Sequence, residues 1–191
     1  MKLLHIDSAI TGDNSVSRKL SAEIVEHLKS SAPDLEVTYC NLVAAPLGHL
    51  TLGDMPASGE STAVLDEFLS ADIVVIGAPM YNFTVSTQLK AWIDRILIAG
   101  KTFRYGETGP VGLAGDKRVV VALSRGGLYT EGGPMRGHEH AETYLRTVLG
   151  FIGITPQFVI AEGMLLGTEQ HATAIARAEH SIAALAPPQE L

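Results

Sequence analysis

Residues Asp72-Ile73-Val74-Val75-Ile76-Gly77-Ala78 form an almost unbroken apolar run, and Pro79-Met80-Tyr81-Asn82-Phe83 follows it directly. A short, continuous apolar run of this kind is typical of a strand that is covered on both faces. The segment Lys117 to Ser124 has the same character and is followed by Arg125-Gly126-Gly127. Two such strands indicate the middle of a parallel sheet with helices on both sides.

Shorter β-rich runs and segments of helical period alternate along the rest of the chain. Leu3 to Asp7, Glu36 to Cys40 and Gln157 to Ala161 are predicted to be three further strands. Gly100 is expected to end the second of the predicted helices. The alternation predicts one α/β domain over residues 1–191, with a five-stranded parallel sheet. Helical spacing of apolar residues is seen at Leu20, Ile24 and Leu28; at Val85, Leu89, Trp92, Ile93 and Ile96; at Leu145, Val148, Leu149 and Ile152; and at Ile175, Ala178, Ile182 and Leu185.

Composition excludes several classes of protein. The 14 basic residues stand against 21 acidic ones, a formal net charge of −7, which argues against a non-specific nucleic-acid binder. Cys40 is the only cysteine, so an internal disulfide framework and a multi-thiolate metal centre are excluded. The longest strongly apolar stretch, residues 73–80, is far shorter than the roughly 18 residues of a membrane span, and no export signal is apparent. We therefore expect a cytoplasmic protein that does not enter a membrane.

Open sheets of this type, with strand order 2-1-3-4-5, bind ligands beyond the carboxyl ends of strands one and three. Strand one is followed by a hydroxyl-rich loop from Ser8 to Ser17, which ends at the start of a helix. Backbone amides at a helix start, with serine hydroxyls beside them, suit a phosphate group. Arg18 and Lys19 occupy the first turn without an acidic residue, a conflict with the helix dipole that a bound anion would resolve. The alternative is that Ser15 only caps the helix.

The loops after the two central strands suggest the rest of a ligand. Residues 80–83 place large, flat or soft side chains at a strand end, where a planar ring could lie, although they could instead pack on the following helix. Gly126 and Gly127 would allow the backbone to approach a ligand closely. A phosphate site and a flat-ring site at one sheet edge together suggest a mononucleotide with a planar head.

On these residues the sequence resembles the FMN-dependent NADH-azoreductases, also described as quinone oxidoreductases, of the flavodoxin-like superfamily. The resemblance extends over nearly the whole chain. It implies a flavodoxin-like, doubly wound sheet of order 2-1-3-4-5 with helices on both faces, FMN as cofactor, NADH or NADPH as reductant, a quinone or azo acceptor, and a homodimer with active sites at the subunit boundary. The motifs that carry it are Ser15-x-Ser17, Met80-Tyr81-Asn82-Phe83, residues 89–95, Ser124-Arg125-Gly126-Gly127, residues 150–154 and Ala161-Glu162-Gly163.

The resemblance also implies roles for individual residues. Ser8, Ser15, Val16 and Ser17 would hold the FMN phosphate and ribityl chain, with Val16, where many relatives have Gln, acting through its backbone. Met80, Tyr81, Asn82 and Phe83, together with Ser124, Arg125, Gly126 and Gly127, would line the isoalloxazine ring. No catalytic acid or base is required, because the flavin carries the chemistry. Beyond the resemblance, we hypothesise that Tyr105, Tyr129 and Phe151 help to form an aromatic sandwich for a quinone or azo acceptor.

Other functions compete with this interpretation. A flavodoxin-type electron carrier would bind FMN without turning over a substrate, but it needs less surface than the long glycine-rich loops provide. A serine hydrolase could use Ser8, although Glu179 and His180 are adjacent and would point in different directions on a helix. No metal site is expected at His138-Glu139-His140. The apolar connector from Leu42 to Met55 is expected either to form a subunit interface or to fold over its own core.

Overall fold

A computed structural model describes residues 1–53, 55 and 62–188. Five parallel strands form the central sheet in the order β2-β1-β3-β7-β8, which confirms the predicted order. They are β1 (Lys2–Asp7), β2 (Glu36–Asn41), β3 (Ile73–Tyr81), β7 (Arg118–Arg125) and β8 (Gln157–Glu162). The helices are α1 (Val16–Ser31), α2 (Ala63–Ser70), α3 (Thr87–Ile96), α4 (Glu142–Phe151) and α5 (Thr168–Ala183).

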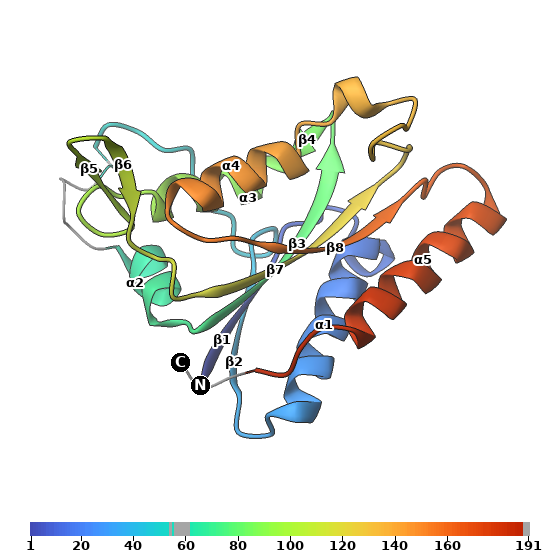
Figure 1. Ribbon diagram of the computed structural model, residues 1–191, viewed down its shortest axis with the longest axis horizontal. Coiled ribbons are helices and arrows are strands. Elements are labelled where there is room, and N and C mark those ends of the chain that lie inside the picture. The colour runs from blue at the N-terminus through green and yellow to red at the C-terminus, as the bar shows by residue number, and fades with distance from the viewer. Residues whose placement is uncertain (54, 56–61, 189–191) are drawn as a thin grey trace.

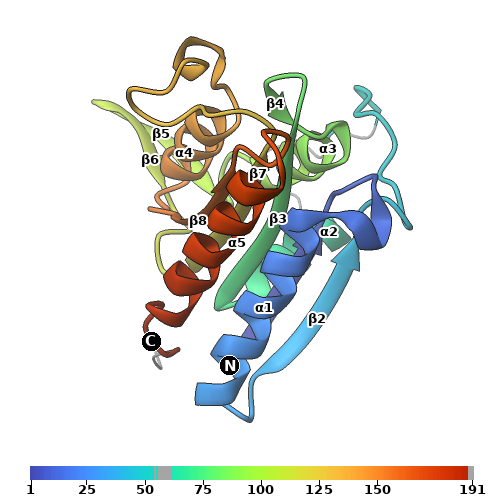
Figure 2. The same cartoon turned by 90° about the vertical axis from the view of Figure 1, so that its right-hand side faces the viewer.

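The helices cover both faces of the sheet. Helices α1 and α5 lie side by side on one face, and α2, α3 and α4 lie on the other (Figures 1 and 2). The side chains of β3 alternate between the two cores, with Val75 packed on the α1 side and Val74 and Ile76 on the α3 side. Both faces of β3 are therefore shielded from solvent, as its apolar sequence predicts. Within the described residues, no helix is long and apolar enough to cross a membrane.

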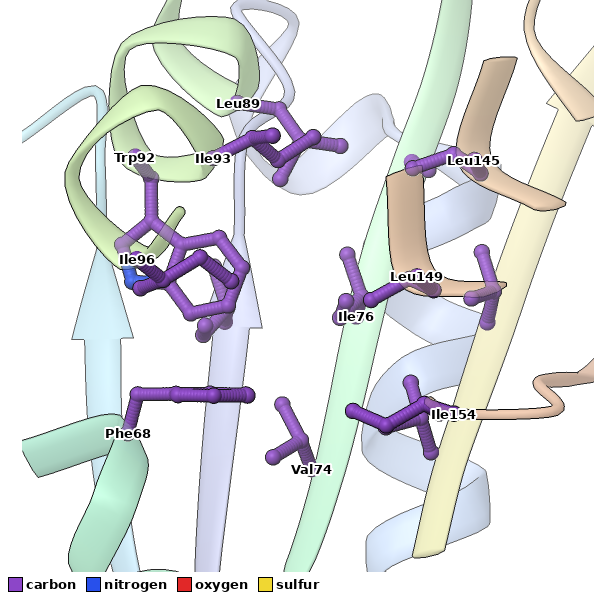
Figure 3. Close-up of a cluster of buried hydrophobic side chains, with 14 of the residues drawn as sticks. Phe68, Val74, Ile76, Leu89, Trp92, Ile93, Ile96, Leu145, Leu149 and Ile154 are labelled. Atoms are coloured by element: carbon purple, nitrogen blue, oxygen red, sulfur yellow. The ribbon is translucent and has the colours of Figure 1, made fainter. Parts of the chain in front are cut away.

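Helix α3 illustrates how the sequence pattern becomes packing. The Ser86 hydroxyl accepts a hydrogen bond from the Leu89 amide at 3.2 Å and so caps the helix start. Leu89, Trp92, Ile93 and Ile96 recur on one face and are all buried. Figure 3 shows these four side chains directed toward the sheet, with Leu145 and Leu149 of α4 across from them. Each such side chain contributes roughly 1.5–3 kcal/mol by leaving water.

Three features differ from the sequence prediction. Strand β3 extends to Tyr81 and pairs with the short β4 (Thr84–Val85), whereas the prediction ended it at Ala78. Helix α3 ends at Ile96, so Gly100 does not end it; Gly100 has φ +80 in the following turn, where its amide donates to the Phe103 carbonyl. Neither α2 nor the hairpin of β5 (Phe103–Gly106) and β6 (Gly109–Gly112) was predicted, because these elements are short and the hairpin is mostly exposed.

A backbone contact attaches this hairpin to the rest of the molecule. A Cβ atom on Gly112 would lie 2.1 Å from the Gly153 nitrogen, so only glycine fits there. The Ala114 amide donates to the Ile152 carbonyl at 2.9 Å beside this contact. The turn after α4 therefore fixes the position of the hairpin.

Gly112→Ala is expected to destabilise the protein by about 1–3 kcal/mol, because the added methyl group collides with backbone rather than with a movable side chain. Gly150→Ala is the matched control, since a Cβ there meets open space inside α4. That variant should keep or raise the free energy of unfolding. Thermal and urea unfolding of both variants measure the difference, and equal stabilities would contradict the close approach.

Candidate functional site

The parallel register brings the carboxyl ends of the central strands to one edge of the sheet. Asp7 of β1 is level with Gly77 of β3, and Pro79 of β3 is level with Ser124 of β7. Figure 1 shows the arrowheads of β3, β7 and β8 at the same side of the molecule. A cleft of about 170 Å³ opens there, lined by Thr11, Asn14, Ser15, Val16, Pro79, Met80, Tyr81, Ser124, Arg125, Gly126, Met164 and Leu165.

A larger cavity of about 480 Å³ lies elsewhere, at the opposite ends of the strands. Its lining includes Met1, Ile73 and Val119, together with Pro187 of the C-terminal segment. It contains none of the hydroxyl-rich or glycine-rich loops that the sequence singles out. The smaller cleft is therefore the candidate functional site.

The start of α1 forms the first wall of the cleft. Ser15 caps the helix by accepting from the Arg18 amide at 3.2 Å, and the Ser15 and Ser17 hydroxyls are 3.1 Å apart. Within the described residues, the amides of Val16 and Ser17 have no protein acceptor. Ser8 is buried nearby and donates to the Gly77 carbonyl at 2.9 Å. Capping and anion binding are thus compatible here, because the cap uses neither of the two spare amides.

Arg18 corrects one step of the sequence argument. Its guanidinium lies 3.6 Å from the buried Asp7 carboxylate and 3.8 Å from Asp13. Asp7 also accepts from the hydroxyls of Ser21 and Tyr39. Arg18 is therefore balanced within the chain and gives no argument for a bound anion, whereas Lys19 is exposed beside it.

The hairpin between β3 and β4 forms the second wall. Asn82 and Phe83 occupy its two-residue turn, with φ of +47° and +75°. Asparagine tolerates this left-handed region, whereas a large aromatic residue there is strained. The His140 amide donates to the Phe83 carbonyl at 3.0 Å, and the His138 ring lies 5.4 Å from the Phe83 ring. Strain that the surroundings hold in place is typical of functional sites.

The first two walls are joined directly. The Ile10 amide donates to the Tyr81 hydroxyl oxygen at 3.1 Å, which links the loop after β1 to the end of β3. Met80 is half-buried and packs against the core, while Phe83 is 44% exposed at the turn. Of the residues predicted to line a flat ring, Met80 and Tyr81 therefore lie at the end of β3, and Asn82 and Phe83 lie in the turn that follows.

Residues 124–127 form the third wall, and their backbone groups are used asymmetrically. The carbonyls of Arg125, Gly126 and Gly127 accept from the amides of Met164, Leu165 and Gly163, respectively, at 2.8–3.2 Å. The amides of Gly126 and Gly127 have no acceptor among the described residues. Sequence reasoning missed Met164 and Leu165, although two apolar residues after a strand end were a usable signal. This wall presents spare donors while its acceptors are occupied.

The Arg125 side chain does not line the cleft as a cation. It is buried among Glu139, Glu142 and Glu162, so only the backbone of Arg125 reaches the cleft. Sequence reasoning missed these carboxylates because their spacing along the chain gives no sign that they meet. Ser124 and the two glycines remain where the motif places them.

Glu139 does not belong to a histidine pair on a helix but caps α4. Its carboxylate accepts from the amides of Ala141, Glu142 and Thr143 and from the Thr143 hydroxyl, at 2.7–3.0 Å. Burial alone would raise the pKa of Glu139, but these hydrogen bonds outweigh it and lower that pKa below its ordinary value. The His138 and His140 contacts with Phe83 then connect the start of α4 to the second wall.

The structure does not bring the three predicted acceptor residues together. Tyr105 is 75% exposed on β5, and both Tyr105 and Phe151 contact Phe103, with ring separations of 5.6 and 4.7 Å. Tyr129 is buried elsewhere, with its ring 5.9 Å from the Arg125 guanidinium. None of the three lines the cleft of its own chain.

The remaining candidates have structural positions. Cys40 lies within β2 and packs against the core, and burial raises the pKa of its thiol, so a reactive thiolate is disfavoured. In the connector, Leu42 is buried against the core, whereas Leu52 and Met55 are exposed. Leu42 therefore folds over the core of its own chain, and the predicted subunit interface stays a prediction.

Taken together, the cleft offers spare amides at a helix start, serine hydroxyls beside them, flat side chains, and two further spare amides opposite. This donor set fits a phosphate and the polar edge of a planar ring, as in a flavin mononucleotide. It does not fit a serine hydrolase, because the Ser8 hydroxyl donates to a backbone carbonyl rather than to a histidine.

Comparison with known proteins agrees with this geometry. A family model described as a flavodoxin-like fold matches residues 1–186. A relative from Gluconacetobacter diazotrophicus named FMN-dependent NADH:quinone oxidoreductase is 54% identical, over 97% of this chain and 99% of its own length. A second, from Bradyrhizobium diazoefficiens, named FMN-dependent NADH:quinone oxidoreductase 2, is 56% identical over 93% and 95% of the two chains.

Solved structures are similar as well. An azoreductase from Bacillus anthracis str. Sterne superposes with a TM-score of 0.86 at 29% identity, covering 96% of this chain and 97% of that one. An FMN-dependent NADH-azoreductase from Bacillus anthracis str. Ames Ancestor, solved in complex with FMN, has a TM-score of 0.83 at 26% identity, covering 96% of each chain.

The sheet, the helices on both its faces and the cleft at the strand ends define a flavodoxin-like protein. Within that class, the chain belongs to the family of FMN-dependent NADH:quinone oxidoreductases.

Glu139→Gln is expected to lower stability by about 1–2 kcal/mol at pH 7, because a charged cap is lost from α4. The folded-state pKa of Glu139 lies below its ordinary value of 4.5, so the carboxylate stabilises the fold above that pH and the effect is lost as pH falls through the folded pKa. Urea unfolding from pH 7 to pH 3 should show the two proteins converging. Glu131→Gln, at an exposed position in the same loop, is the control. A pH-independent difference would contradict the assignment.

Proposed function

We propose that this chain is an FMN-dependent oxidoreductase that uses NADH or NADPH to reduce quinones and to cleave azo compounds reductively. The observation that carries the proposal is the cleft itself, which is lined by Val16 on one side and Gly126 on the other. The amides of these two residues, and of Ser17 and Gly127 next to them, have no acceptor among the described residues. Identity of 54–56% to relatives named for quinone reduction, over nearly the whole chain, supports the same activity.

Each wall of the cleft has a role in holding the cofactor. The phosphate would be bound by the hydroxyls of Ser15 and Ser17 and by the amides of Val16 and Ser17. Ser8 would hold the loop in place through its hydrogen bond to the Gly77 carbonyl. The second wall, from Met80 to Phe83, and the third, from Ser124 to Gly127, would hold the isoalloxazine ring. Bound FMN supplies two-electron chemistry, taking reducing equivalents from a nicotinamide and passing them to the acceptor.

The protein contributes position and electrostatics. The third wall would direct two amide dipoles toward the negative charge that develops on reduction, because its carbonyls accept hydrogen bonds from the loop after β8. Donors fixed in this way need no reorganisation when charge appears. No side chain of the chain is required as an acid or base.

The chain should bind one FMN, with an absorbance band near about 450 nm, and should then oxidise NADH at a steady rate when a quinone is added. Stopped-flow absorbance and NADH consumption measure the two steps. Absence of the band after FMN addition would overturn the proposal, and a bound flavin without turnover would favour an electron carrier. Cleavage of p-nitrophenyl esters without bound flavin would favour a hydrolase.

A matched pair of substitutions tests the phosphate site. Ser15→Asp keeps a strong helix cap but sets a carboxylate against the phosphate, whereas Ser15→Asn keeps the cap without charge. Repulsion between the Asp carboxylate and the phosphate, about 4 kcal/mol for unit charges roughly 4 Å apart, should weaken FMN binding by the Asp variant more than hundredfold. The Asn variant should stay within tenfold of the wild type. Equal affinities of the two variants would place the phosphate elsewhere.

We propose that the working unit is a homodimer of two such domains, each spanning residues 1–191, in the cytoplasm. The cleft of one chain, about 170 Å³, is smaller than the roughly 300–1,000 Å³ of sites that enclose a small molecule. Large apolar side chains are exposed beside it, among them Ile10, Phe83 and Leu165. A second copy would complete the cleft, and Tyr105 and Phe151 of one chain would then meet the acceptor bound at the other.

Complementation tests this arrangement. Ser15→Asp and the double variant Tyr105→Ala/Phe151→Ala should each turn over acceptor poorly alone. When the two chains are coexpressed, half of the dimers are mixed and each has one intact site, so about one quarter of wild-type turnover should return. A fully active monomer, or no recovery in mixed dimers, would contradict the shared site.

A further inference from the structure

Arg125, the last residue of β7, holds a buried cation among three carboxylates, of which Glu139 is buried and Glu142 and Glu162 are partly exposed. Its side chain is fully buried, and its guanidinium nitrogens lie 3.7 Å from Glu139, 3.3 Å from Glu142 and 3.3 Å from Glu162. The Tyr129 ring covers it at 5.9 Å. A charge removed from water in this way needs counter-charges, and three carboxylates converge to supply them.

Two of these carboxylates, Glu162 and Glu139, also hold different parts of the segment between β7 and α4, residues 126–141. Glu162 accepts from the Tyr129 and Thr130 amides at 2.8 and 3.2 Å, near the start of the segment. Glu139 caps α4 at the end of the segment. Glu142, the first residue of α4, accepts from Arg125 and pairs with Arg146. One guanidinium therefore connects both ends of the segment to the strand from which it begins.

The backbone of the same residue belongs to the third wall of the cleft. The Arg125 carbonyl accepts from Met164, and the next two residues are Gly126 and Gly127, whose amides have no acceptor in the part of the chain that the structure describes. The chain bends at Gly126 and Gly127, directly after Arg125. The side chain of Arg125 therefore holds residues 126–141, and its backbone leads directly into the two amides.

Stability alone explains this cluster poorly. Among the described residues, Arg125 Nε and Nη2 are buried without a hydrogen-bond partner, and Nη1 donates only to Glu142, at 3.3 Å. A buried ion pair with incomplete hydrogen bonding contributes little to folding, and apolar replacements of such pairs are often neutral or stabilising. A planar, forked cation that reaches three carboxylates does give one defined geometry.

We propose that Arg125 is a positioning residue, which clamps residues 126–141 and thereby directs the Gly126 and Gly127 amides toward the negative charge of the reduced cofactor. The inference rests on the proposed function. It assigns to the Arg125 side chain a part in tuning the cofactor rather than in contacting it.

Arg125→Met and Arg125→Lys test the clamp, because lysine keeps the charge but cannot reach three carboxylates as a fork. Arg146→Met is the matched control, since it removes an exposed cation from the same Glu142. Affinities for oxidised and reduced FMN are measured by titration under air and under dithionite. Both Arg125 variants should lose at least tenfold more affinity for the reduced than for the oxidised form, equivalent to a potential about 30 mV lower for a two-electron couple. Arg146→Met should change both affinities by less than threefold.

A second measurement does not involve the cofactor. Trypsin cleavage after Arg136, which is half-exposed within the segment, is followed by mass spectrometry on the protein without FMN. The clamp predicts cleavage at least tenfold faster in Arg125→Met and unchanged in Arg146→Met. If both Arg125 variants fail to fold, Glu162→Gln decides, since it keeps an acceptor for the Thr130 amide but removes one counter-charge, and should shift both measurements in the same direction.

The outcomes separate the two proposals. Equal loss of both FMN forms, or retention of the wild-type ratio by Arg125→Lys, would overturn the positioning role while leaving the proposed function intact. Unchanged trypsin cleavage in Arg125→Met would also overturn it. A wild-type chain that binds neither form of FMN would overturn the proposed function itself, and the cofactor part of this inference with it.

Discussion

The pairing of β3 with β7 is the constraint on which the rest of the structure depends. Seven consecutive residue pairs, from Ile73 level with Arg118 to Pro79 level with Ser124, join two strands that are buried on both faces. A shift of one residue would exchange the two faces of a strand, so both cores oppose it. This register brings the turn at Asn82 and the glycines after Arg125 to the same edge. The cleft follows from it.

Backbone hydrogen bonding explains how that edge is able to bind a ligand. The amides of Gly163, Met164 and Leu165 satisfy the carbonyls of the third wall, and Ser15 caps α1 without occupying its first amides. Spare donors without spare acceptors suit an anionic, electron-rich ligand. The arrangement includes two unfavourable features, the left-handed backbone of Phe83 and the buried charge of Arg125. Both are stabilised by the segment between β7 and α4.

The sequence predicted most of the framework because its signals are local. Continuous apolar runs located β3 and β7, and helical spacing located α1, α3, α4 and α5. The hairpin of β5 and β6 was not predicted, since its position depends on the approach of Gly112 to Gly153, about forty residues further along the chain. Gly100 was misassigned for a related reason: its positive φ is real, but it serves a turn toward Phe103 rather than the end of α3.

At the site, the sequence by itself determined the types of residue and the loops that carry them, because the serines, the flat side chains and the glycines each follow a recognisable strand. Only the tertiary structure decided what their side chains do. Arg18 turns to the buried Asp7, Arg125 withdraws among three glutamates, and Tyr129 is separated from Tyr105 and Phe151. The physical reason is that a charge or a ring is placed by its partners, and here those partners come from other strands and loops, brought into contact only by the register of the sheet.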